Sequence, residues 1–306
     1  MKNFIYSFVL VSLIACNYSN SQEPKSEPPR DFNGYWYAGQ AEITSFILEQ
    51  ARYGEIHSGE AVLVFVTEPF SQSKQVKLDN WRDQSPDNVS VMKLNMTKKF
   101  LTGIYPYSMM MSSFTPVSQD KYPDAFKVTT SSQEWCGHTW MQVNLRDDQY
   151  QVQGFSYFES EGDVNIEVPN TILEDELWTR LRINPEKLPT GKIEILPSSF
   201  YLRLRHREVE LKSAEASLID LKSSEFSKSS HRKYEIKYDD RLLSIYFESA
   251  FPHKILGWEE IYKSGFGNSE TLTTRAKRIN TIKSAYWGKN SNKDRAIRKE
   301  LGLSTE

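Results

Sequence analysis

Cysteine is nearly absent from this chain of 306 residues, which contains Cys16 and Cys136 alone. A framework of several disulfides or a zinc site built from cysteines is therefore excluded, and stability must come from packing. Long apolar runs are also missing beyond the N-terminus: Ala61–Val66, the longest, has six residues, whereas a membrane helix needs about 20. Neither charge dominates, with 38 basic and 40 acidic residues, so we expect no nucleic-acid partner.

The sequence also lacks the short motifs of common enzyme classes. It contains no Gly-x-Ser-x-Gly elbow, no phosphate-binding loop and no dinucleotide fingerprint. Four histidines, His57, His206, His231 and His253, stand alone without the spacing of metal ligands, which favours surface or capping roles. We therefore expect no metal and no cofactor, and the sequence favours a non-enzymatic protein over an enzyme.

The N-terminus has the pattern of an export signal. Lys2 precedes Phe4–Ile14, an uncharged run of roughly 16 Å as a helix, which is too short to span a bilayer. The run ends in Leu-Ile-Ala-Cys at positions 13–16, which resembles the lipobox of bacterial lipoproteins. The resemblance implies removal of residues 1–15, diacylglycerol on the Cys16 thiol and an acyl group such as palmitate on its new amino group. An ordinary secretory signal followed by an unrelated cysteine is the alternative.

The composition changes abruptly after the cysteine. Residues 16–33 are rich in Ser, Pro, Glu and Asn, and they cannot bury enough apolar surface to fold, so we interpret them as a tether. A flexible coil of this length spans on the order of 20 Å. Asn17 rather than Asp follows Cys16, and the lipoprotein resemblance then implies the outer membrane. We predict a cell-envelope protein that contacts the membrane through lipid on Cys16.

Residues 34–306 have the pattern of a globular body that is mainly β, of the α+β class. Short runs that alternate apolar and polar residues predict a curled antiparallel sheet, as a half-barrel or a sandwich, with one or two short helices. Ser58-Gly59 is expected to form a turn. The expected strands are Gln40–Leu48, Tyr53–His57, Glu60–Thr67, Val89–Leu94, Tyr107–Phe114, Phe126–Gln133, Thr139–Leu145, Tyr150–Phe158, Lys192–Leu196, Tyr201–Leu211, Tyr234–Tyr238 and Leu242–Phe247.

The main helix is expected over Thr171–Ile183. Thr171-Ile-Leu-Glu174 matches a capping box, in which both side chains bind free backbone N–H groups. Apolar residues then recur at helical spacing on one face. This helix could join two subdomains, 34–169 and 190–306.

Basic residues gather between Arg275 and Lys299, where nine Lys or Arg accompany a single acidic residue, Asp294. The segment could contact anionic lipid or cell-wall polymer, or it could be a solvated face of the body. A second short helix is expected over Asn292–Leu301, ended by Gly302.

Cys136 and His138 form the most reactive-looking spot, in Trp135-Cys136-Gly137-His138. Two residues apart on a strand, a thiol and an imidazole point the same way and could form a nucleophile pair or bind a metal. The same residues also suit a hairpin with Gly137 as a turn or bulge, in which Cys136 is a buried small hydrophobe.

A second candidate is a cluster of methionines. Met109, Met110 and Met111 lie next to Tyr105 and Tyr107. Because Met adapts to varied shapes, these residues could line an apolar ligand cavity. Filling of the core is the alternative.

Several stretches resemble a family of bacterial lipoproteins labelled septum formation inhibitor Maf. The resemblance covers nearly the whole mature chain. It does not include the Ser-x-Ser-Pro-Arg-Arg motif of the cytoplasmic Maf pyrophosphatases, so no catalytic residue is carried over from those enzymes. The matching stretches are Gln50–His57, Ala61–Glu68, Thr102–Ser108, Gln133–His138, Glu176–Thr179 and Ser284–Trp287.

Two functions are compatible with these patterns. The first is a membrane-anchored envelope lipoprotein, without catalysis, that binds an apolar ligand, a lipid or an envelope protein. The second is a hydrolase or metal-dependent enzyme centred on Cys136 and His138.

Overall fold

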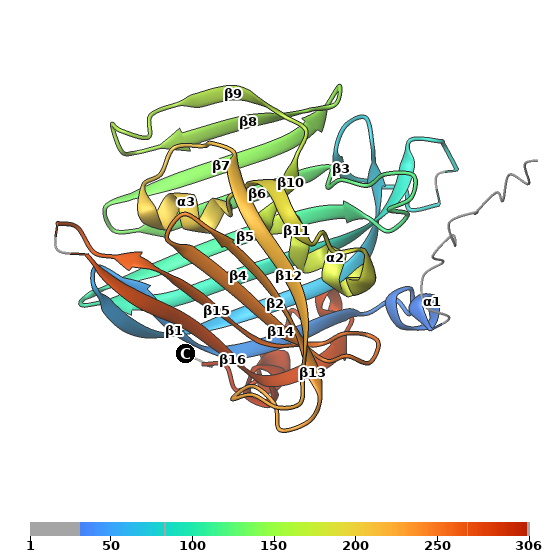
Figure 1. Cartoon of the computed structure of the whole chain (residues 1–306). Coiled ribbons are helices and arrows are strands. Elements are labelled where there is room, and N and C mark those ends of the chain that lie inside the picture. The colour runs from blue at the N-terminus through green and yellow to red at the C-terminus, as the bar shows by residue number, and fades with distance from the viewer. Residues whose placement is uncertain (1–30, 83, 268, 305–306) are drawn as a thin grey trace, which may run out of the picture.

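One large curled sheet organises the chain in the computed structural model, which describes residues 31–82, 84–267 and 269–304 (Figure 1). Within this part of the chain the sheet has 16 strands. Hydrogen-bonded neighbours follow the order β10-β11-β12-β13-β14-β15-β16-β1-β2-β4-β5-β6-β7-β8-β9, and β3 pairs with β2. Neighbouring strands are antiparallel except β10 and β11. The predicted mainly β fold with a curled antiparallel sheet is confirmed.

The strands differ widely in length. Their bounds are β1 (Ala41–Arg52), β2 (Glu55–Ser71), β3 (Val76–Lys77), β4 (Asn88–Thr102), β5 (Tyr105–Pro116), β6 (Lys127–Glu134), β7 (Gly137–Arg146), β8 (Gln149–Ser156), β9 (Val164–Pro169), β10 (Ile172–Leu173), β11 (Gly191–Leu196), β12 (Lys212–Leu221), β13 (His231–Tyr238), β14 (Arg241–Phe247), β15 (Ile255–Ser264) and β16 (Glu270–Ser284). The long strands β1, β2 and β4 lie near the middle of the strand order. Strand β1 pairs with β16, so the first and the last strand of the chain are neighbours in the sheet. Residues of 34–169 and of 190–306 therefore belong to the same sheet.

The helices are short, and two of them fill the curl of the sheet. In the described residues there are four α-helices, where the sequence predicted one or two: α1 (Phe32–Trp36), α2 (Leu177–Ile183), α3 (Ser199–Arg205) and α4 (Ala296–Glu300). Helices α2 and α3 lie inside the curl (Figure 1), where their apolar side chains share one core with side chains from strands on both sides. No described helix is long and apolar enough to cross a membrane.

The predicted start of the main helix is wrong. Ile172 and Leu173 form strand β10, and the 3-10 turn η1 (Glu174–Glu176) precedes α2. The Thr171 hydroxyl donates to the carbonyl oxygen of Glu194 (3.0 Å) instead of capping the helix. Ile172 and Leu173, which the capping box would place in the first turn of the helix, pair with β11 instead. The helix therefore starts several residues later, at Leu177.

Two further expectations are corrected. Tyr201–Leu211 was expected as a strand, but α3 occupies its first half, because the carboxylate of Asp175 accepts from the Ser199 amide (2.9 Å) at the helix start. Residues 199–204 are all buried, so no polar face marks the helix in the sequence. Ser58-Gly59 is not a turn, because β2 continues through it. Gly59 is required there, since a Cβ would lie 2.2 Å from the Lys99 carbonyl oxygen.

Other local predictions are confirmed. Strands β13 and β14 form the expected hairpin around Asp239, which has a φ of +46°. The C-terminal helix is present as a 3-10 turn, η4 (Asn292–Arg295), followed by α4, and Gly302 has a φ of +66° just beyond it. Leu301 and Leu303 then pack on Ala41 and the outer face of the sheet.

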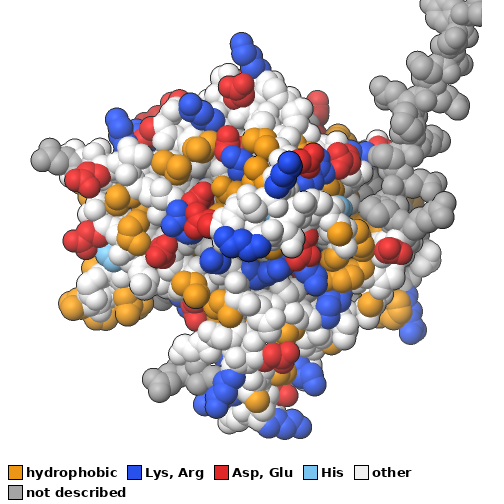
Figure 2. Space-filling view, turned by 60° about the horizontal axis from the view of Figure 1, so that its bottom comes forward, with side chains coloured by type: hydrophobic (Ala, Val, Ile, Leu, Met, Phe, Trp, Pro, Cys, Tyr) orange, Lys and Arg blue, Asp and Glu red, His pale blue; other side chains and the backbone are white. Residues whose placement is uncertain are grey.

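Charges are mixed on the face that carries the C-terminal helix. Figure 2 shows Lys and Arg side chains interspersed with Asp and Glu, without one continuous basic patch. Within the basic segment, Arg275 pairs with Glu259 (2.7 Å) and Arg278 pairs with Glu248 (2.8 Å). The structure thus balances part of this segment with local carboxylates.

Charged groups also lie deep inside the curl. Lys98 contacts one carboxylate oxygen of Glu260 (2.5 Å) and Arg241 contacts the other (3.0 Å), and Arg241 also binds Glu174 (2.5 Å). All four side chains are buried. Burial opposes ionisation of Glu260, but Lys98 and Arg241 outweigh it and lower its pKa to about 2. This network therefore stays ionised in the interior.

Candidate functional site

A cleft of about 390 Å³ opens between α3 and strands β7–β9. We call it the α3 cleft. Its walls are largely apolar, with side chains from β7, from the edge strand β9 and from the segment around α3. These wall residues are Met141, Val164, Ile166, Leu202 and Val209. Strand β9 is the last strand at one edge of the sheet. Helix α3, and not a further strand, faces this edge, and the cleft lies between them.

Hydroxyl groups form the floor of the α3 cleft. Thr130 of β6 and Ser199 of α3 hydrogen-bond to one another through their side chains. The Ser199 hydroxyl also donates to Oδ2 of Asp175 (2.6 Å), which lies behind it. Burial raises the pKa of Asp175 in spite of these hydrogen bonds, and no donor from the described residues reaches its Oδ1. Because the Ser199 proton points to Asp175 and the Thr130 proton to Ser199, the floor presents hydroxyl oxygens that can accept a hydrogen bond from a ligand.

The mouth of the cleft is charged. His206, which ends α3 with a φ of +50°, hydrogen-bonds through Nδ1 to Glu161 in the β8–β9 turn. Arg203 lies 3.4 Å from the same carboxylate. Burial opposes ionisation of Glu161, but the His206 hydrogen bond and the charge of Arg203 lower its pKa. Arg207 beside them is exposed, and no ion pair with another described residue is found for it. The mouth thus combines a fixed pair of charges with one accessible cation.

A third arginine, Arg52, lies behind the mouth and contacts His206. Arg52 donates from Nη2 to the Tyr107 hydroxyl (3.1 Å) and lies over the ring of Tyr53, with its Cζ 4.2 Å from the centroid. It also lies within 3.4 Å of His206 Nε2. These contacts fix the end of α3 against strands β1 and β5.

Sequence reasoning missed the mouth residues. Glu161 and His206 are 45 positions apart and share no motif, and His206 was interpreted as a surface or capping residue. It does end a helix, but it also forms the polar contact between α3 and the β8–β9 turn. No local signal in the sequence could have paired them.

The methionine cluster does not line the α3 cleft. Met109 and Met111 are buried in the main core, and Met110 points to the outer face of β5. Tyr107 is buried and bound to Arg52, and Tyr105 packs near the ring of Trp135 (6.3 Å). Met109 and Met111 are core residues, which agrees with the alternative interpretation of the cluster as filling of the core.

Cys136 lies in the two-residue turn between β6 and β7, and it is exposed, so the expectation of a buried thiol is wrong. A hydrogen bond to Glu134 and the charge of that carboxylate raise the pKa of the thiol. His138 is exposed opposite Gln133. Among the described residues, no group of three His, Cys, Asp or Glu side chains could hold a metal ion. The turn therefore presents an exposed thiol whose pKa is raised by the neighbouring carboxylate of Glu134.

Iodoacetamide is expected to label Cys136 more slowly than free cysteine at neutral pH, because a raised pKa leaves fewer thiolates. The Glu134→Gln variant is expected to label faster, since it removes the charge. A chain beginning at Asn17 has Cys136 as its one thiol and keeps every described element, from Phe32 to Glu300. Mass spectrometry measures the rate. Labelling well above the rate of free cysteine would instead indicate an activated thiolate.

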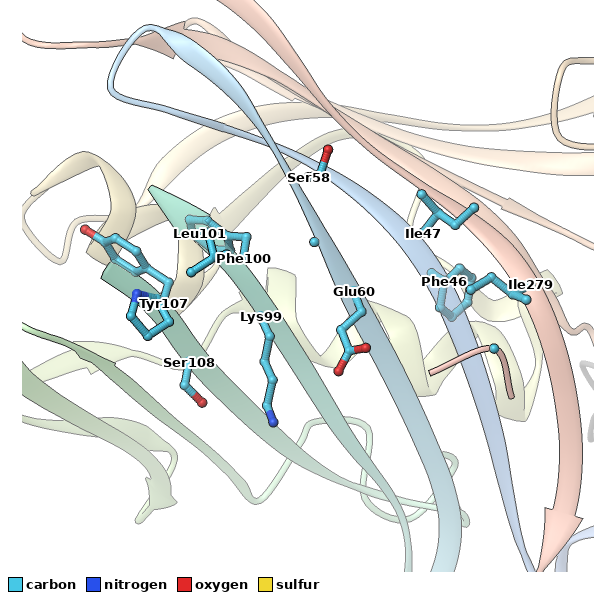
Figure 3. Close-up of a pocket in the computed structure, with 13 residues that line it drawn as sticks. Phe46, Ile47, Ser58, Glu60, Lys99, Phe100, Leu101, Tyr107, Ser108 and Ile279 are labelled. Atoms are coloured by element: carbon cyan, nitrogen blue, oxygen red, sulfur yellow. The ribbon is translucent and has the colours of Figure 1, made fainter. Parts of the chain in front are cut away.

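A wider trough of about 520 Å³ lies on the outer face of the sheet. Figure 3 shows Glu60 and Lys99 side by side in it, from β2 and β4, and Ile47 and Ile279 on the other side. Gly302 of the C-terminal segment closes one end. The trough is broader and shallower than the α3 cleft and has no buried polar floor, which makes the cleft the better candidate site.

Comparison with known proteins adds little. No protein-family model matches the chain, and no curated protein sequence matches it. Among solved structures, the chain is similar to a beta-barrel-like protein of domain of unknown function DUF1849 from Brucella abortus. The two share 9% sequence identity, with a TM-score of 0.46, over 80% of this chain and 97% of that one.

Proposed function

We propose that this protein is a membrane-anchored lipoprotein of the cell envelope that binds an amphipathic ligand with an apolar chain in the α3 cleft. The observation that supports this function is the make-up of the cleft, with apolar walls, hydroxyls on its floor and Arg207 at its mouth. Its volume of about 390 Å³ lies within the usual range of small-molecule sites, roughly 300–1,000 Å³. In this proposal Cys16, outside the described residues, carries the lipid that anchors the protein to the outer membrane.

The hydrolase hypothesis has weaker support. An efficient thiol nucleophile needs a lowered pKa and a base within hydrogen-bond reach. Cys136 instead has a raised pKa, and its recorded side-chain partner is the carboxylate of Glu134. The raised pKa disfavours Cys136 as the nucleophile of such an enzyme.

Dansyl-labelled undecanoic acid, which combines an apolar chain with a carboxylate, is expected to bind the chain that begins at Asn17. Val164→Trp is expected to weaken this binding about tenfold or more, because the larger side chain would occupy the cleft from the edge strand β9. Val164 is only partly buried, so the substitution is compatible with folding. Dansyl fluorescence measures the affinity.

The matched control is Val76→Trp. Val76 is an exposed residue of the short strand β3 and does not line the cleft. This variant is expected to bind the probe like the unmodified chain. Equal affinities in both variants would show that the probe binds elsewhere, and failure of the unmodified chain to bind would overturn the proposal.

A further inference from the structure

Five successive hairpin turns carry apolar side chains at one end of the sheet. They are the turns β15–β16, β1–β2, β4–β5, β6–β7 and β8–β9, which follow one another along the strand order. We call their exposed apolar residues the apolar rim. These residues, with their exposed fractions, are Tyr53 (36%), Ile104 (82%), Trp135 (69%), Tyr157 (70%) and Phe266 (67%).

The other end of the same sheet is different. Its turns expose polar residues, such as Asp147 and Asp148 between β7 and β8, and Asp120 and Lys121 between β5 and β6. The β12–β13 loop, residues 222–230, is rich in Ser and Lys. Trp81 is an exposed aromatic residue at that end, where the Arg82 guanidinium lies over its ring (4.6 Å). Tyr37, Tyr286 and Trp287 are exposed at that end as well, but they lie outside its hairpin turns, so exposed apolar residues at successive hairpin tips are a property of the rim end.

The mouth of the α3 cleft lies at the rim. The ring of His206 is 5.8 Å from that of Phe266, and Arg203 lies over the ring of Phe158. Phe158 in turn contacts the ring of Tyr157 (5.5 Å). Hydrophobic side chains also gather at the left edge of the space-filling view, the side on which these turns project (Figures 1 and 2). An apolar surface thus borders the entrance of the cleft.

We propose that the apolar rim inserts into the headgroup region of a lipid bilayer, and that the α3 cleft exchanges its ligand with that bilayer. The second clause rests on the function proposed above. Trp and Tyr favour the interface between membrane and water, because their rings are apolar with a polar edge. Separate projecting tips suit a fluid bilayer, which accommodates each side chain independently, whereas a protein partner would need a matching pocket for each. The β4–β5 and β6–β7 turns, with Ile104 and Trp135, have no charged residue at their tips.

Sedimentation with vesicles tests the rim. The chain beginning at Asn17, which lacks the lipidated cysteine, is expected to sediment with vesicles of equal parts phosphatidylethanolamine and phosphatidylglycerol. The variant Ile104→Ser/Trp135→Ser is expected to bind these vesicles about tenfold more weakly or worse, because two exposed apolar side chains that do not line the α3 cleft are lost. The control Trp81→Ser, at the opposite end, is expected to bind like the unmodified chain.

Probe binding separates this inference from the proposed function. The rim variant is expected to bind dansyl-labelled undecanoic acid normally, which also shows that it is folded, and Val164→Trp is expected to keep its vesicle binding. No sedimentation of the unmodified chain, or equal sedimentation of the rim variant, overturns membrane insertion. Sedimentation that depends on the rim, without any probe binding, supports insertion and overturns ligand binding in the cleft.

Discussion

Replacing Arg182 by Met is expected to lower the free energy of unfolding by about 3–5 kcal/mol at neutral pH, since it leaves a buried carboxylate without its partner. Arg182 and Glu42 are both fully buried and joined by two hydrogen bonds, of 2.6 and 2.8 Å. The guanidinium also lies over the rings of Trp36 and Phe65, which are buried as well. Urea unfolding monitored by circular dichroism measures the loss.

The pH dependence of this variant identifies the cause. Burial opposes ionisation of Glu42, but Arg182 outweighs it and lowers the pKa of the carboxyl. The native pair therefore contributes stability above the unfolded pKa of Glu42 and loses it as the pH falls through the folded pKa. Arg182→Met removes the strongest group that lowers this pKa, so burial then opposes ionisation against only the Tyr35 hydrogen bond and the charge of Lys254. The deficit is then expected to shrink as the pH is lowered toward the ordinary pKa of Glu.

A surface ion pair supplies the control. Arg298 lies 3.7 Å from Glu60, and both side chains are partly exposed. Arg298→Met is expected to change stability by less than about 1 kcal/mol. Similar small losses for the two substitutions would contradict the assigned role of the buried pair.

Trp258→Ala is expected to lower the free energy of unfolding by about 3–5 kcal/mol, the usual cost of truncating a large buried aromatic residue. Trp258 is fully buried between the rings of Phe46 (4.9 Å) and Trp178 (5.3 Å), which belong to β1 and α2. Its indole N–H also donates to Glu260 (3.1 Å), so the truncation removes a hydrogen bond of the interior network as well. Thermal or urea unfolding measures the change.

Trp81→Ala is the matched control. This side chain is 66% exposed and its ring packs against the Arg82 guanidinium, so the change is expected to stay within about 0.5 kcal/mol. A loss from Trp258→Ala no larger than this would mean that helix α2 does not depend on the indole for its place inside the sheet.

Sequence patterns predicted the sheet well because most strands bury one face. The alternation in β4, where Leu94, Met96 and Phe100 are buried between more exposed neighbours, is typical of the strands found. Helix α3 was missed for the opposite reason, since it is enclosed by the sheet and has no polar face. Pairing between β10 and β11 likewise overrode the capping signal at Thr171, because the preference of a few local residues is weaker than a ladder of the sheet.

The candidate site was beyond sequence reasoning for a geometric reason. Its charged mouth forms where the β8–β9 turn meets the end of α3, and these segments belong to opposite edges of the sheet. Cys136 and His138, neighbours in the sequence, are placed in an exposed hairpin instead. Sequence reasoning considered residues that are neighbours in the chain, whereas the mouth of the α3 cleft joins Glu161 and His206, which are 45 positions apart.

The unpaired edges of the sheet have a mechanical consequence. Strands β9 and β10 are consecutive in the chain and end the hydrogen-bonded order on its two sides, so the described part of the protein is a split ring rather than a closed one. The α3 cleft runs along the split, and Glu161 holds it shut at one end through His206 and Arg203. If the gap between the two edges widened, β8 and β9 would bend outward and Glu161 would lose its contacts with His206 and Arg203. The hydrogen bonds between paired strands would remain, because β9 and β10 do not pair with one another. Under the proposed function, the width of a ligand in the α3 cleft would be limited by the stiffness of the two-stranded segment β8–β9 and not by the circumference of the sheet.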